Sequence, residues 1–230
     1  LEIEAFNPEE YWSIEADNLF DKQPFAAKLT QLQGEKMKQF SITNAEQAEK
    51  ANTVLKDASN GKLSVAKVEK KQRKRNPAAP FTTSTLQQEA SRKLGFGAQK
   101  TMRTAQRLYE GIDIGAGQTG LISYMRTDSV SLSNEALEDI RTLILQKYGA
   151  DSLPESPRSF KTKSKNAQEA HEAIRPTSAM NIPEQIKQHL SQDEYRLYDL
   201  IWKRSIACQM IHATLDTVAV DLKAGPENTF

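Results

Sequence analysis

The stretch GLISYMRTDS, residues 120–129, carries residue types that can react with a phosphate group. Residues two apart face the same side of an extended backbone, so Tyr124, Arg126 and Asp128 are predicted to share one face. A free tyrosine has a pKa near 10, so ionising it at neutral pH costs roughly 4 kcal/mol. A cation within about 4–6 Å favours the phenolate by about one to three pKa units, and Arg126 can supply that cation. Tyr124 is therefore a candidate nucleophile.

The neighbours of Tyr124 suit a phosphate site as well as an ordinary strand. Arg126 can also hold a phosphate directly through charge-assisted hydrogen bonds. Asp128 can orient Arg126, while Thr127 and Ser129 can donate hydrogen bonds to a phosphate or begin a turn. Taken alone, this motif is more simply explained as a packed tyrosine with polar neighbours, so a second motif is needed.

That second motif is HEAIRPT, residues 171–177, which is predicted to lie in a short helix ended by Pro176. His171 and Arg175 are four residues apart and would share one helix face, with Glu172 off that face and structural. A histidine can move a proton near neutral pH, and an arginine can clamp a phosphate with two hydrogen bonds. His171 alone would more simply be a surface or packing residue. Together with Tyr124, the two cations predict transesterification of a phosphodiester, with the bond kept as phosphotyrosine.

GLISYMRTDS together with AHEAIRPT resembles bacterial type IA DNA topoisomerases, and the two motifs are far more specific together than apart. The resemblance extends over nearly the whole chain through AFNPEEYW, PFTTSTLQQEASRKLGFGAQKTMRTAQRLYEG and YRLYDLIWKRSIACQM. It implies that Tyr124 attacks DNA to form a 5′-phosphotyrosine, that Arg126 holds the scissile phosphate and that His171 acts in the same site. The DNA-contacting set that it implies is Arg126, Thr127, Asp128, Ser129, His171 and Arg175, with Glu172 as a further motif member.

The resemblance also implies an activity, a cofactor and partners. The family relaxes negative supercoils without ATP by passing a strand through a transient single-strand break. The expected partners are single-stranded DNA, negatively supercoiled DNA and the remaining domains of the same enzyme, in the cytoplasm at the nucleoid and without a membrane. Mg²⁺ would be bound by a toprim domain that this chain lacks, so no metal ligand is expected here and the chain alone is expected to be inactive.

The predicted fold class is α+β and multidomain, with a mostly helical domain bearing the tyrosine inserted into a mainly β arch. Residues 1–79 are expected to form the first part of the arch, 80–205 the helical domain and 206–230 the return of the arch. Expected strands cover 11–20, 25–32, 38–43, 62–69, 121–126 and 214–222, and helices cover 45–60, 84–94, 98–110, 134–148, 166–175 and 191–210. Helix caps are expected at Asn44 and Ser133, and capping boxes at Ser84 with Gln87 and at Ser191 with Glu194. Met102, Ala105 and Tyr109 are expected at helical spacing on the helix over 98–110. Residues 70–80 are expected to be a basic linker, and 112–119 a flexible glycine-rich insertion.

Composition fits a soluble chain that is part of a longer protein. The sequence has 230 residues, a net charge of +1 and one cysteine, so overall charge does not argue for nucleic acid and no internal disulfide is possible. Cys208 is expected to fill a core. The start and the end of the sequence suggest an excised piece of a longer chain.

The motifs allow three other interpretations. Tyrosine recombinases also combine Tyr, Arg and His, but their tyrosine follows the other motifs, whereas Tyr124 precedes His171. A non-catalytic helical module that binds single-stranded DNA would merely pack Tyr124. A mobile gate piece would bind single-stranded DNA weakly, with an affinity that falls steeply with salt.

Overall fold

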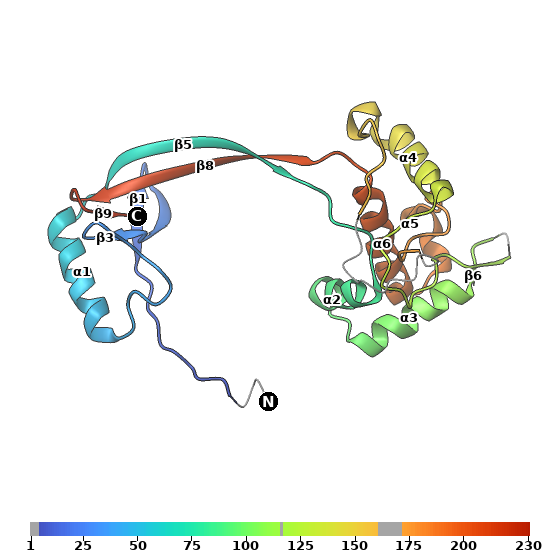
Figure 1. Ribbon diagram of the computed structural model, residues 1–230, viewed down its shortest axis with the longest axis horizontal. Coiled ribbons are helices and arrows are strands. Elements are labelled where there is room, and N and C mark those ends of the chain that lie inside the picture. The colour runs from blue at the N-terminus through green and yellow to red at the C-terminus, as the bar shows by residue number, and fades with distance from the viewer. Residues whose placement is uncertain (1–4, 116, 161–171) are drawn as a thin grey trace. The chain divides into compact units, whose positions relative to one another are not determined.

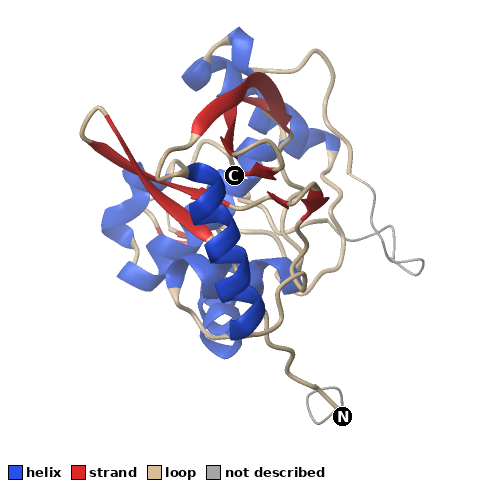
Figure 2. Cartoon of the chain, turned by 90° about the vertical axis from the view of Figure 1, so that its left-hand side faces the viewer, coloured by secondary structure: helices blue, strands red, loops and turns tan. Residues whose placement is uncertain are grey.

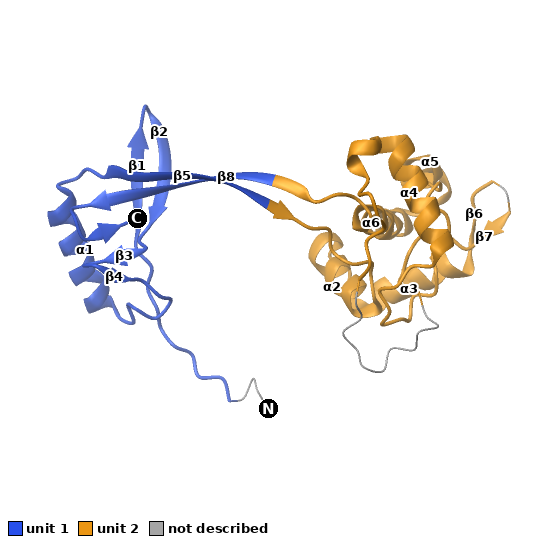
Figure 3. Ribbon diagram, turned by 45° about the horizontal axis from the view of Figure 1, so that its top comes forward, with its two compact units in different colours: residues 1–73, 215–230 blue, residues 74–214 orange. Residues whose placement is uncertain are grey.

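The computed structural model describes residues 5–115, 117–160 and 172–230 and confirms the α+β fold class. The chain contains both helices and strands (Figure 2), and all strand pairs with a described register are antiparallel. The chain forms two compact units, residues 1–73 with 215–230 and residues 74–214 (Figure 3). Two long strands, β5 (Ser64–Arg75) and β8 (Ala213–Ala224), carry the chain out of the first unit and back into it (Figure 1).

Unit 1 consists of a hairpin, a sheet and one helix. In the hairpin, β1 (Glu15–Phe20) pairs with β2 (Gln23–Lys28) around a turn at Asp21 and Lys22, whose φ angles are 48° and 63°. The sheet has the order β4-β3-β9-β8-β5, with β3 (Gln31–Leu32), β4 (Glu35–Lys36) and β9 (Asn228–Thr229) as its short members. Residues 38–43, expected to be a strand, form turns instead.

The core of unit 1 is small. Helix α1 (Ala45–Ser59) begins at the predicted cap Asn44, whose side chain accepts the Gln47 N–H, and it buries Ala51 and Leu55. Leu55 packs with apolar side chains from the sheet region, namely Leu29, Leu222, Ala224 and Phe230. A core of this size depends on each of its members, since burying one leucine stabilises by about 1.5–3 kcal/mol.

The basic run at residues 70–75 is a strand and not the linker that was expected. β5 continues to Arg75 with nearly every residue exposed. The neighbouring strand β8 supplies partners, because the Thr217 hydroxyl donates to the Lys71 carbonyl over 2.9 Å and Gln72 donates to Asp216 over 3.0 Å. Pairing with a distant strand overrides the turn and charge signals of the local sequence.

Unit 2 is built around α6 (Gln192–Cys208), which contacts α2 (Thr83–Leu94), α3 (Ala98–Glu110), α4 (Asn134–Tyr148) and α5 (Pro183–Ile186). The predicted capping box of Ser191 and Glu194 begins α6, and a buried stripe follows at helical spacing. The stripe comprises Leu197, Tyr198, Ile201, Trp202, Ser205, Ile206 and Cys208. Cys208 fills the core as expected, and burial raises the pKa of its thiol to about 12.

One local prediction for unit 2, a helix cap, was wrong, and one hairpin was not predicted. The capping box of α2 is formed by Thr82 and Thr85, not by Ser84 and Gln87, because Thr82 is the residue whose extended backbone lets its hydroxyl reach the helix N–H groups. The glycine-rich insertion is a hairpin in which β6 (Ile112–Asp113) pairs with β7 (Gln118–Thr119). The Asp113 carboxylate accepts the N–H groups of Gly115 and Gly117, which fixes the turn.

Two short 3₁₀ segments complete the unit, η1 (Ala150–Ser152) after α4 and η2 (Lys187–His189) after α5. Neither was predicted, since three-residue turns leave no periodic signal in the sequence.

Candidate active site

The segment that carries Tyr124 is anchored at every second residue. Its backbone is extended only in part. Among the described residues, the one strand-like pairing of residues 121–126 is the bridge between Ile122 and Pro176. Burial nevertheless alternates with a period of two, as the predicted shared face requires. The buried members are Met125, Thr127 and Ser129, and the exposed members are Tyr124, Arg126 and Asp128.

Thr83, the first residue of α2, fixes the backbone of this segment. Its hydroxyl donates to the Met125 carbonyl over 2.8 Å and accepts the Thr127 N–H over 2.9 Å. Its own N–H donates to the Thr127 carbonyl over 2.9 Å. One threonine at the start of a helix therefore holds the backbone on both sides of Arg126.

The hydroxyls of Thr127 and Ser129 shape the chain's own turns. Thr127 Oγ1 accepts the Ser129 N–H, and Ser129 Oγ accepts the Ser131 N–H, each over 3.1 Å. Both residues are buried, so of the two roles predicted for them the structure shows the turn.

Ser123, directly before Tyr124, joins this segment to residues 173–175. Its N–H donates to the Arg175 carbonyl over 2.8 Å, its hydroxyl donates to the Ala173 carbonyl over 2.7 Å and accepts the Arg175 N–H over 3.0 Å. The Ile174 N–H donates to the Phe81 carbonyl over 2.8 Å. Residues 172–176 are therefore extended, and the predicted helix over 166–175 is wrong for this part. Pairing on both sides, with Pro176 disfavouring helical geometry before it, accounts for the difference.

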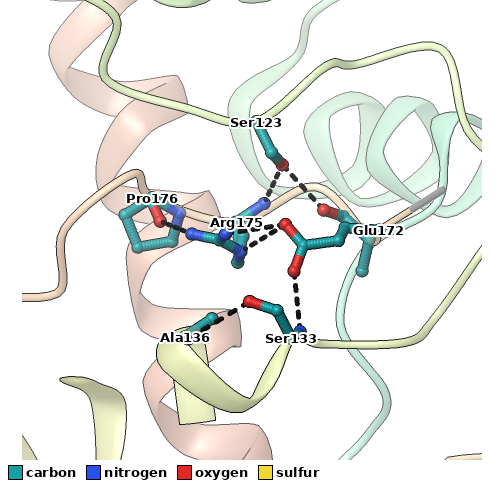
Figure 4. A network of polar contacts seen from close by, with 7 residues as sticks. Ser123, Ser133, Ala136, Glu172, Arg175 and Pro176 are labelled. Atoms are coloured by element: carbon teal, nitrogen blue, oxygen red, sulfur yellow. Dashed lines mark hydrogen bonds and ion pairs between the residues drawn. The ribbon is translucent and has the colours of Figure 1, made fainter. Parts of the chain in front are cut away.

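Arg175 faces the chain itself. Its Nε and Nη2 donate to Oε2 of Glu172 over 3.0 and 2.6 Å, and its Nη1 donates to the Pro176 carbonyl over 3.0 Å (Figure 4). The other oxygen of Glu172 accepts the N–H of Ser133, the cap of α4, over 2.6 Å. Glu172 is structural, as predicted, and it occupies the donors that were expected to clamp a phosphate.

Two effects compete at the Glu172 carboxyl. Burial acts to raise its pKa, but the hydrogen bonds from Ser133 and the charge of the Arg175 guanidinium outweigh burial and leave the pKa below its ordinary value. The carboxylate is therefore ionised at neutral pH and holds the start of α4 against residues 172–176.

Arg126 and Asp128 do not form the predicted pair. Within the part of the chain that the structure describes, no carboxylate lies within 4.0 Å of the Arg126 guanidinium, although both side chains are exposed. Asp128 therefore does not orient Arg126 here, and the charge of Arg126 faces solvent beside Tyr124. His171 lies outside the described residues.

Tyr109, in the last turn of α3, contacts Tyr124 and was not predicted to do so. The two rings meet edge to face, with centroids 5.4 Å apart and an interplanar angle of 65°. The sequence placed Tyr109 on a helix face with Met102 and Ala105, which gave no sign that the insertion at 112–119 folds back and returns the chain to the end of α3.

The family model described as DNA topoisomerase matches residues 1–230, the whole chain. The chain belongs to the DNA topoisomerase family. It is 56% identical over 230 residues to DNA topoisomerase 1 of Xylella fastidiosa (strain Temecula1), which covers 100% of this chain and 28% of that protein. It is 54% identical over 222 residues to DNA topoisomerase 1 of Rickettsia bellii, which covers 96% of this chain and 27% of that protein.

The fold of this chain also matches a solved topoisomerase structure. Full-length topoisomerase I from Thermotoga maritima aligns with a TM-score of 0.72 at 34% identity, over 99% of this chain and 34% of that one. The chain thus spans about 28% of the length of the curated relatives named above. The resemblance drawn from the two motifs is confirmed.

No group of three or more His, Cys, Asp or Glu side chains converges within residues 5–115, 117–160 and 172–230. None of the helices in those ranges has the length and apolarity needed to cross a bilayer.

Proposed function

We propose that this chain is the tyrosine-bearing part of a type IA DNA topoisomerase, in which Tyr124 cleaves and rejoins one DNA strand. The observation that carries the proposal is the exposed Tyr124 and Arg126 on a backbone that Thr83 and Ser123 fix from two sides. Such a backbone holds the Cα atoms of Tyr124 and Arg126, from which the phenol and the guanidinium extend, in a constant relation to each other. Holding reactants in place removes much of the entropic barrier to attack.

The reaction exchanges one ester for another. The phenolic oxygen of Tyr124 forms a bond to the scissile phosphorus, and the bond from phosphorus to the 3′ oxygen of the upstream nucleotide breaks. The phenol loses its proton, and the departing 3′ oxygen gains one. The downstream strand is then held as a 5′-phosphotyrosine, and attack by the 3′ hydroxyl reverses every step, so no ATP is consumed.

Arg126 is proposed to bind the scissile phosphate. Its guanidinium has no carboxylate partner among the described residues, so it can offer its donors to the phosphate without breaking an ion pair. Charge-assisted hydrogen bonds of this kind contribute about 1.5–3 kcal/mol each. His171 is proposed to act in the same site, and Asp128 to line it. Arg175 contributes by holding Glu172 and the backbone before Tyr124, and binds DNA only if that ion pair opens.

The whole enzyme is proposed to supply what the described residues do not. Mg²⁺ would be held by its toprim domain, single-stranded and negatively supercoiled DNA would be its substrates, and the cytoplasmic nucleoid would be its location. Unit 1, with the strands β5 and β8, is proposed to be the arch that carries the tyrosine unit. We expect the 230-residue chain alone to bind single-stranded DNA in a salt-dependent way without cleaving it.

The test is covalent trapping. The whole enzyme is mixed with Mg²⁺ and a single-stranded oligonucleotide labelled at its 3′ end, and denatured rapidly. We expect label on the protein, because the 3′-terminal piece carries the 5′ phosphate. A substrate labelled at the 5′ end should leave no label on the protein.

Tyr124→Phe should abolish the labelled band while DNA binding remains. Tyr148→Phe is the matched control, since Tyr148 is 42% exposed and Tyr124 is 45% exposed, and Tyr148 lies at the end of α4 away from the Tyr124 segment in sequence. A labelled band that survives in Tyr124→Phe would refute the assignment of the nucleophile. Binding without any label in the unsubstituted enzyme would leave a non-catalytic module for single-stranded DNA.

A further inference from the structure

We propose that Tyr109 is a positioning residue for Tyr124, and that its ring sets the orientation of the attacking phenol. The inference rests on the proposed function. It starts from the edge-to-face contact between the two rings, whose centroids are 5.4 Å apart. This distance and angle fall in the range that aromatic pairs prefer.

The backbones that carry the two rings are locked together. The Leu121 N–H donates to the Leu108 carbonyl over 2.7 Å. A Cβ placed on Gly120 would lie 2.8 Å from the Tyr109 carbonyl oxygen, so only glycine permits this approach. The end of α3 and the start of the Tyr124 segment therefore hold a fixed separation, and neither ring can drift from the other through backbone movement.

The contact lies at the surface and not in the core. Tyr109 is 41% exposed and Tyr124 is 45% exposed, while their neighbours Leu108 and Met125 are fully buried. An exposed tyrosine on a fixed backbone would otherwise sample several side-chain rotamers. The Tyr109 ring contacts Tyr124 in the rotamer that the structure shows and so stabilises that rotamer. Rotating the Tyr124 side chain into another rotamer would break the aromatic contact.

Because both rings are half-exposed, Tyr109 can affect the cleavage rate without contributing much to folding stability. A buried ring removed from a core costs about 3–5 kcal/mol, whereas a half-exposed ring contributes much less to folding. The contact leaves nearly half of the Tyr124 surface open to a substrate. Its main effect should therefore be on the rate of attack, through the fraction of time that the phenol spends in the reactive orientation.

The hairpin at residues 112–119 connects the two tyrosines along the chain. It starts after Gly111, the residue that caps α3, and ends directly before Gly120, with β6 paired to β7. This insertion therefore has a structural role in the proposal: it returns the chain to the end of α3 so that the second ring meets the first.

The experiment measures single-turnover cleavage by the whole enzyme at saturating oligonucleotide, with Mg²⁺. Aromatic pairs of this geometry are worth a rate factor of roughly 2- to 12-fold, so Tyr109→Leu should slow formation of the covalent complex by that factor. Tyr109→Phe keeps the ring edge and should stay within about 2-fold of the unsubstituted rate. The dissociation constant for the oligonucleotide should be unchanged in both variants. The melting temperature should be unchanged in Tyr109→Phe and should fall in Tyr109→Leu only by the few degrees that one aromatic pair contributes.

A second readout needs no activity. In the 230-residue chain with fluorotyrosine at position 124, the ¹⁹F chemical shift depends on the neighbouring aromatic ring. The ¹⁹F resonance should therefore move in Tyr109→Leu, which removes that ring, and keep its position in Tyr109→Phe, which retains it. An unshifted resonance in the Leu variant would overturn the contact itself.

The outcomes distinguish this inference from the proposed function. If the unsubstituted enzyme forms no covalent complex, the proposed function fails and the inference fails with it. If the complex forms and Tyr109→Leu cleaves at the full rate, only the inference fails. If Phe is as slow as Leu, or if both lose affinity at an unchanged rate, Tyr109 acts through its hydroxyl or as a DNA contact, and positioning by the ring is refuted.

Discussion

Glu172→Gln tests whether the pair of Glu172 and Arg175 holds the backbone around the candidate nucleophile. The carboxylate accepts two N–H groups of Arg175 on one oxygen, at 2.6 and 3.0 Å, and the Ser133 N–H on the other, at 2.6 Å. Glutamine keeps an acceptor for Ser133 but loses the charge that faces Arg175. The variant should therefore weaken unit 2 without removing the cap of α4.

The magnitude follows from the exposure of the pair. Hydrogen bonds to charged groups contribute about 1.5–3 kcal/mol, and fully exposed ion pairs contribute about 0–1 kcal/mol. The side chains of Arg175 and Glu172 are 16% and 31% exposed, which places this pair between those limits. We expect Glu172→Gln to lower the free energy of unfolding by about 1–2 kcal/mol, and the melting temperature of unit 2 by about 2–8 °C.

At acid pH the unsubstituted chain and Glu172→Gln should have the same free energy of unfolding. The pKa of Glu172 lies below its ordinary value, so its stabilising contribution is complete above the unfolded-state pKa of about 4.3. The contribution is lost as the pH falls through the lower, folded-state pKa. The gap between the unsubstituted chain and Glu172→Gln should therefore be largest near neutral pH, begin to narrow as the pH falls past about 4.3, and close at the lower, folded-state pKa.

The assay is urea unfolding of the 230-residue chain at several pH values, followed by circular dichroism. Glu46→Gln is the matched control, because the ion pair of Glu46 with Lys50 in α1 is 78% and 74% exposed and should contribute little. A loss below about 0.3 kcal/mol at pH 7, or a loss that persists unchanged at pH 3, would refute the stabilising role of the pair.

Three further predictions concern the surroundings of Tyr124 and the core. Gly120→Ala should destabilise unit 2 by about 1–3 kcal/mol in thermal unfolding, since the added Cβ would lie 2.8 Å from the Tyr109 carbonyl oxygen; an unchanged melting temperature would show that this approach relaxes freely. Thr83→Val should cost about 1–3 kcal/mol in the same measurement, because it leaves two backbone groups of the Tyr124 segment without their partner, whereas Thr83→Ser should be nearly neutral. Cys208, whose pKa burial raises to about 12, should resist a maleimide reagent in the folded chain and react once urea unfolds it; rapid labelling under native conditions would contradict its burial.

Short-range patterns in the sequence predicted much of the fold. The caps at Asn44, Ser133 and Ser191 were found because a cap acts within three residues of itself. The alternation of exposed and buried side chains from Tyr124 onward was predicted, because a period of two is visible in a stretch of only a few residues.

Predictions failed where a distant partner decided the outcome. Residues 172–175 read as helical, but Phe81 and Ser123 pair with their backbone and hold it extended. Arg175, predicted to contact DNA, donates to Glu172 in this structure, and its role at a phosphate stays a prediction. The contact of Tyr109 with Tyr124 depends on a hairpin whose turn residues signalled only a loop. Local propensity carries no information on which segments meet.

The alternating burial of residues 124–129 also makes the candidate site open to chemical substitution. The anchors are the buried side chains and the backbone groups held by Thr83, and none of them belongs to the three exposed side chains. Each exposed side chain can therefore be replaced, even by an unnatural amino acid, while the backbone keeps its position. Phenols of graded acidity at position 124 would then form a series in which one variable changes, and the slope of rate against acidity would report how much charge the attacking oxygen carries in the transition state.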